Sequence, residues 1–121
     1  SGDHAGAVEV YREALRLGAE GGVAEERLAI ICFNLGWAAF RLRDLETAEE
    51  NFLRALGVYE EAEFQPRVAL QALSCLCEIA IVQGARAKQK AYAARLEKAR
   101  KRTRARGESP ELILSGPVVR E

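Results

Sequence analysis

The C-terminal third of this chain concentrates cationic side chains that could bind a polyanion. Residues 86–106 carry ten lysine and arginine residues against one acid, Glu97, although the whole chain has a net charge of zero. Along a helix these cations would form a positively charged rod that can contact phosphates or an acidic protein surface. The candidate contact residues are Lys88, Lys90, Arg95, Lys98, Lys101 and Arg102.

Two alternatives remain open for this basic segment. No aromatic platform or base-reading motif accompanies the charge, so nucleic acid is a less favoured partner than an acidic protein surface, which includes residues 1–85 of a second copy. The other interpretation is a solvated terminal helix, whose last-turn cations stabilise the negative end of the helix dipole.

Nucleophiles, general bases and metal ligands are few and scattered. The cysteines are Cys32, Cys75 and Cys77, and the single histidine, His4, lies near the N-terminus. Cys75 and Cys77 are two residues apart in a predicted helix, so they point to different sides and cannot share one metal ion. The chain has no glycine-rich phosphate loop, no histidine pair at helical spacing, and no serine or cysteine with a nearby histidine. We therefore expect no enzymatic activity, no metal site and no cofactor.

Composition and apolar spacing predict one all-α domain. The 121 residues are 49% apolar and include only three prolines, which is typical of a single helical domain. Five helices are expected, with Asp44 as an N-cap and Gly18 and Gly84 as helix ends. They should span about residues 5–17, 23–42, 44–61, 67–83 and 86–106. No apolar run approaches the roughly 20 residues of a membrane helix, and no secretory leader is evident. We expect a cytoplasmic protein that makes no membrane contact.

The predicted helices repeat. Ala7, Tyr11 and Ala14 return forty-one residues later as Ala48, Phe52 and Ala55. The central stretch resembles the tetratricopeptide repeat, whose pattern is W-x2-L-G-x2-Y followed by A-x3-F-x2-A and a late proline. The matching residues are Leu35, Gly36, Ala48, Phe52 and Ala55, whereas Cys32, Ala39 and Glu60 replace the Trp, Tyr and Pro.

The resemblance implies a fold and an organisation. The fold would be a stack of antiparallel helix hairpins with about two and a half repeats in residues 2–106, the complete central repeat spanning about 29–62. The basic helix 86–106 would close the stack, and 107–121 would be an extended or disordered tail. Gly36 would allow two helices to pack closely. Because about three repeats are usually needed to bury the apolar faces, the open ends could drive homo-oligomer formation.

The resemblance also implies a function. The first helix of each such repeat lines a concave groove that receives a partner peptide or helix, so we expect a protein-interaction scaffold or adaptor. The groove positions would be Ile30, Phe33, Trp37, Phe40 and Arg41, followed in the next repeat by Glu78 and Ile81. An aromatic groove edged by an arginine suits an apolar segment bearing a carboxylate. The alternative is that Phe33, Trp37 and Phe40 pack against the fifth helix, the tail or a further helix.

Overall fold

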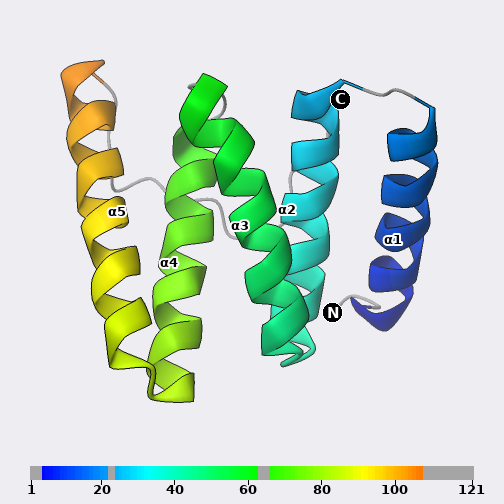
Figure 1. Cartoon of the computed structure of the whole chain (residues 1–121), viewed down its shortest axis with the longest axis horizontal. Coiled ribbons are helices and arrows are strands. Elements are labelled where there is room, and N and C mark those ends of the chain that lie inside the picture. The colour runs from blue at the N-terminus through cyan, green and yellow to red at the C-terminus, as the bar shows by residue number, and fades with distance from the viewer. Residues whose placement is uncertain (1–3, 22–23, 63–65, 108–121) are drawn as a thin grey trace.

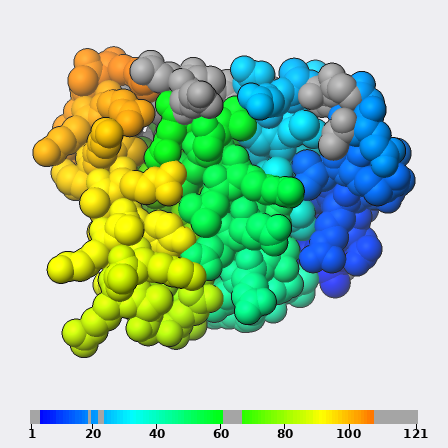
Figure 2. All heavy atoms as spheres, in the orientation of Figure 1, coloured from blue at the N-terminus to red at the C-terminus, as the bar shows by residue number. Residues whose placement is uncertain are grey.

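Five α-helices and no strands make up the part of the chain that the structure, a computed structural model, describes (Figure 1). The described residues are 4–21, 24–62 and 66–107. The helices are α1 (His4–Glu20), α2 (Glu25–Arg41), α3 (Leu45–Ala62), α4 (Pro66–Gln83) and α5 (Arg86–Ala105). They stack in chain order from α1 at one end to α5 at the other, and long side chains of α5 project from its end (Figure 2). The predicted all-α repeat fold is confirmed.

The expected tail, residues 107–121, lies outside the described residues from residue 108 onward. None of the described helices is long and apolar enough to cross a membrane.

The helix boundaries follow local chemistry, with one exception. The Asp44 carboxylate accepts hydrogen bonds from the Thr47 amide at 3.3 Å and the Thr47 hydroxyl at 2.7 Å, so it caps α3 as predicted. Gly84 follows α4 as expected. The prediction that Gly18 ends α1 is wrong, because α1 continues to Glu20 with Gly18 buried inside it. A glycine within a helix costs about 1 kcal/mol relative to alanine, a cost that the surrounding helix offsets.

The turns after α2 and α4 have the same geometry. Arg43 and Gly84, forty-one residues apart, each have a φ of 68°. In the first turn the Asp44 amide bonds the Ala39 carbonyl at 2.9 Å, and the equivalent bond forty-one residues later has the same length. This left-handed position is easy for glycine and strained for arginine. The repeat seen in the sequence is therefore also a repeat of backbone conformation.

The two helices of the central hairpin, α2 and α3, approach closely at Gly36. A Cβ atom at this position would lie 2.9 Å from Cδ1 of the Phe52 ring, well inside van der Waals contact. Phe52 is fully buried, so its ring has no solvent-filled space into which it can move. The missing side chain of Gly36 is thus what allows the ring to lie against α2, as the sequence predicted.

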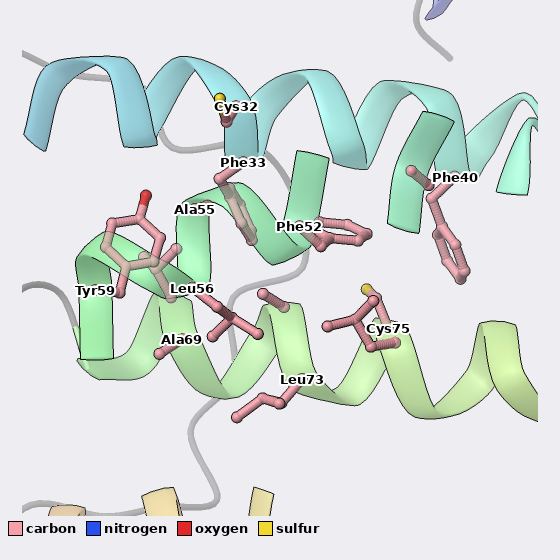
Figure 3. Close-up of a cluster of buried hydrophobic side chains, with 14 of the residues drawn as sticks. Cys32, Phe33, Phe40, Phe52, Ala55, Leu56, Tyr59, Ala69, Leu73 and Cys75 are labelled. Atoms are coloured by element: carbon pink, nitrogen blue, oxygen red, sulfur yellow. The ribbon is translucent and has the colours of Figure 1, made fainter. Parts of the chain in front are cut away.

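One apolar core joins α2, α3, α4 and α5. Figure 3 shows the side chains of Phe33 from α2 and of Phe52 and Leu56 from α3 between the ribbons of α2 and α4. Leu73 of α4 belongs to the same cluster. From α5, Tyr92 is the buried member of this cluster. A smaller cluster attaches α1 to the outer side of α2, where Val8 packs with Leu35 and Ala38.

Polar contacts add to the attachment of α5. The Tyr92 hydroxyl donates a hydrogen bond to Oε2 of Glu49 in α3, and Lys88 Nζ lies 3.1 Å from the same carboxylate. One helical turn further, Arg95 donates to Glu60 at 2.7 Å. Burial, and then the Glu49 carboxylate, raise the pKa of Tyr92 to about 12. The third and fifth helices are therefore joined directly, although they are not consecutive.

We predict that Gly36→Ala destabilises the fold by about 1–3 kcal/mol, because the new methyl group overpacks against the Phe52 ring. Urea unfolding measures the effect. The matched control is Gly57→Ala in α3, where a Cβ meets no atom within 4 Å and where alanine should stabilise the helix by about 1 kcal/mol. Equal effects of the two substitutions would show that the Gly36–Phe52 contact does not exist.

We also predict that Tyr92→Phe lowers the free energy of unfolding near neutral pH by about 1.5–3 kcal/mol, the range for a hydrogen bond to a charged group. The pKa of Tyr92 is raised from 10.0 to about 12, so its contribution is complete below pH 10 and is lost as pH rises toward 12. The difference between the wild type and Tyr92→Phe should therefore shrink over that interval. A difference that is independent of pH up to 12 contradicts the Tyr92–Glu49 bond.

Candidate partner-binding surface

The middle of α2 is buried on most of its circumference. Phe33 has no exposed surface, and its ring centroid lies 5.7 Å from that of Phe52, with the planes tilted by 55°. The expectation that Phe33 faces an open groove is wrong, because α2 is packed against α1, α3 and, through Phe33 and its neighbours, the core shared with α4. Phe40 is 8% exposed and belongs to the same core. Both rings therefore lie in the core, beneath the side chains that α2 exposes to solvent.

The residue of this set with partly accessible aromatic surface is Trp37. It is half-buried and packs against the core cluster, with its ring centroid 6.0 Å from that of Phe40. The guanidinium carbon of Arg41, one turn further along α2, lies 5.8 Å from the indole centroid, within the range of a cation–π interaction. Arg41 is exposed, and Ile30 is half-buried at the other end of the helix. The structure thus brings Trp37, Phe40 and Arg41 together, whereas Phe33 is fully buried and packs on Phe52.

The corresponding face of α4 is more open than that of α2. Ile81 is 57% exposed and Glu78 is exposed one turn earlier. Val82, the neighbour of Ile81, is 60% exposed. Two large aliphatic side chains in water beside a carboxylate offer apolar contact area together with one fixed negative charge. The α4 residues expected from the repeat register therefore lie at the surface.

The six candidate cations of α5 divide into two groups. Lys88 and Arg95 form ion pairs with α3, and Arg102 is half-buried beside Tyr59 and Thr103. Lys90, Lys98 and Lys101 are exposed and form no ion pair with any residue of the described ranges. Of the expected cationic rod, Lys88 and Arg95 are paired with carboxylates of α3, and its role as a contact surface stays a prediction.

The α3 contacts of α5 were missed by the sequence reasoning. A signal was present, because Lys88, Tyr92 and Arg95 have the spacing i, i+4, i+7, which puts them on one helical face. The sequence did not identify the residues that this face contacts. The order of the helices does not indicate that α5 reaches past α4 to Glu49 and Glu60 of α3.

The thiols of this chain are poorly suited to act as nucleophiles. All three cysteines are free, and Cys32 and Cys75 are buried. Burial raises the pKa of Cys75 to about 12 and also raises that of Cys32, so both stay protonated near neutral pH. Within the described residues, no group of three or more His, Cys, Asp or Glu side chains is placed to hold a metal ion.

Comparison with known proteins supports the repeat assignment. The family model of the tetratricopeptide repeat matches residues 29–62, which run from the second turn of α2 to the end of α3. No curated protein and no solved structure matches the chain. The matched segment has the antiparallel hairpin, the close contact at Gly36 and the buried Phe52 described above. The α2–α3 hairpin therefore matches the tetratricopeptide repeat, and the described part of the chain has an all-α helical-repeat fold.

Proposed function

We propose that this chain is a protein-interaction module that binds a segment of a partner protein along the exposed faces of α2 and α4. Repeats of this family generally mediate protein–protein interaction, and stacked helix pairs present extended binding surfaces. The observation that carries the proposal is Trp37, a half-buried indole with Arg41 beside it on a helix whose other aromatic rings are in the core. Accessible tryptophan and arginine side chains are the residue types most enriched among binding hot spots.

The chemistry of this surface defines the partner segment. The Trp37 face and the exposed Ile81 side chain favour apolar residues, and the Arg41 guanidinium can pair with a carboxylate in a bidentate geometry. Glu78 would favour a cation on the same segment. The proposed ligand is accordingly a short peptide or helix with an apolar residue next to an acidic one. Phe40, whose ring centroid lies 6.0 Å from that of Trp37, supports the indole from the core side, and the buried Phe33 has no direct role.

An adaptor of this kind would act in the cytoplasm, as the sequence analysis expects. The three cysteines are unpaired, which suits a reducing compartment. Self-association through the ends of the stack stays a prediction, with Val10 and Leu17 as exposed apolar residues on α1.

A second candidate function rests on α5. Lys90, Lys98 and Lys101 are exposed and outside the ion pairs with α3, so they remain accessible to a polyanion or an acidic protein. Such binding would weaken steeply as the salt concentration rises, whereas binding through Trp37, with one charge pair at Arg41, need not.

The test of the first function is Trp37→Ala. Peptides selected from a phage-displayed random library on the wild-type chain serve as probes, and calorimetry measures their affinity. We expect at least a tenfold weaker Kd, about 1.4 kcal/mol, because the apolar anchor is lost, with unchanged helical content by circular dichroism. Leu17→Ala, which removes an exposed apolar side chain from α1, is the control and should leave the affinity unchanged.

Two results would count against this function. Unfolding of Trp37→Ala would mean that the indole is a core residue. A selected peptide that binds Trp37→Ala and Leu17→Ala equally well would exclude Trp37 as an anchor.

For the second function, we predict that the triple variant Lys90→Glu, Lys98→Glu, Lys101→Glu leaves peptide affinity within about twofold, since these side chains lie on the outer face of α5. Binding of a short duplex DNA probe, measured by fluorescence anisotropy at two salt concentrations, completes the test. Loss of peptide binding in the triple variant, with Trp37→Ala unaffected, would transfer the proposed function to α5.

A further inference from the structure

A cavity of about 490 Å³ lies between α1, α2 and α3. Its apolar lining consists of Leu15, Leu28, Ala29, Cys32 and Val58. The volume falls within the range of about 300–1,000 Å³ that is typical of small-molecule sites. None of the proposed peptide-contacting residues of α2 and α4 lines it, so the cavity is a separate feature of the fold.

One lining residue departs from the repeat pattern. Cys32 stands at the position where the pattern carries a tryptophan, and its side chain is much smaller than an indole. Cys32 is 5% exposed and forms part of the inner wall. The cavity opens to solvent on one side, where its charged lining residues Arg12, Arg16, Glu25 and Arg54 are exposed.

The charged groups of the cavity are mainly cationic. Arg12 and Arg16 of α1 and Arg54 of α3 line it, against one acid, Glu25 of α2. Arg16 is already paired with Glu13 and with Glu20, the latter at 3.2 Å. Neither Arg12 nor Arg54 forms an ion pair with another described residue, and Arg54 is close enough to Cys32 to lower the pKa of its thiol, against the larger effect of burial. Two arginines without a carboxylate partner therefore adjoin an apolar wall.

We infer that this cavity binds a small organic anion with an apolar body, of the class of medium-chain carboxylic acids. The chain would lie against Leu15, Leu28 and Val58, and the carboxylate would accept hydrogen bonds from Arg54 and Arg12. An apolar wall with two arginines beside it suits a short apolar body that carries one anionic end.

Decanoate is the probe, used below its micelle-forming concentration, and isothermal titration calorimetry measures binding to the full chain. Decan-1-ol tests the need for the charge and decyltrimethylammonium tests its sign. We expect saturable binding of one decanoate per chain, at least tenfold weaker binding of decan-1-ol, and no binding of the cation. Equal affinity for the three compounds would overturn the inference.

Variants locate the site. Arg54→Gln should weaken decanoate at least fivefold and leave decan-1-ol unchanged, whereas Arg86→Gln, an equivalent change at the start of α5, should affect neither. Cys32→Trp should abolish decanoate binding by filling the cavity. Because Cys32→Trp can fail to fold, Arg54→Gln decides the matter, since Arg54 is exposed. The inference is overturned if Arg54→Gln leaves the decanoate affinity unaltered. It is also overturned if Trp37→Ala abolishes decanoate binding while Arg54→Gln does not affect it. Neither outcome decides whether the α2–α4 surface binds a peptide, because the Trp37→Ala peptide measurements test that separately.

Discussion

At Gly36 the Phe52 ring lies against the backbone of α2, and this contact sets the separation of α2 and α3. A Cβ atom would lie 2.9 Å from the ring, so any other residue would push the helices apart or move a fully buried phenylalanine. Once Phe52 is in place, Phe33 packs on it at 5.7 Å, and the two rings face the core contributed by α3 and α4. The position of this aromatic layer then decides which side chains of α2 stay near the surface, and among its aromatic residues that is Trp37. The proposed binding surface therefore depends on a glycine that is not part of it.

The last helix is attached by a different mixture of forces. α5 contributes one buried aromatic residue, Tyr92, to the core, and its partly buried Leu96 and Ala99 pack against the same core. This is less apolar contact than the central helices make, and it is supplemented by Lys88 and Arg95, which pair with Glu49 and Glu60 of α3. Partly buried pairs of this kind are screened less by salt than exposed ones. Part of the negative charge of residues 1–85 is thus paired with part of the positive charge of α5 within the same molecule.

Departures from the repeat pattern are as informative here as agreements with it. Gly36 and Phe52 follow the pattern and form a tight contact, whereas Cys32 replaces its tryptophan and borders the cavity of about 490 Å³. Arg43 occupies a left-handed turn position that Gly84 occupies one repeat later. The space beside Cys32 lies between three helices, and it is there, away from Trp37, that we infer a second ligand.

The sequence by itself determined the elements and their order. Apolar spacing, the Asp44 cap and the forty-one-residue repeat predicted five helices in antiparallel pairs, because these signals act within a few turns of one helix or between adjacent helices. They also predicted the roles of Gly36 and Gly84. The sequence did not determine which groove residues remain exposed, or where the charges of α5 are used. Phe33 is buried because more than one helix packs around α2, and Lys88 and Arg95 are paired because α5 reaches α3 across the chain order. Burial and ion pairing at these positions depend on contacts with several residues that are distant in the sequence. The helical periodicity of a single segment carries no information about those residues.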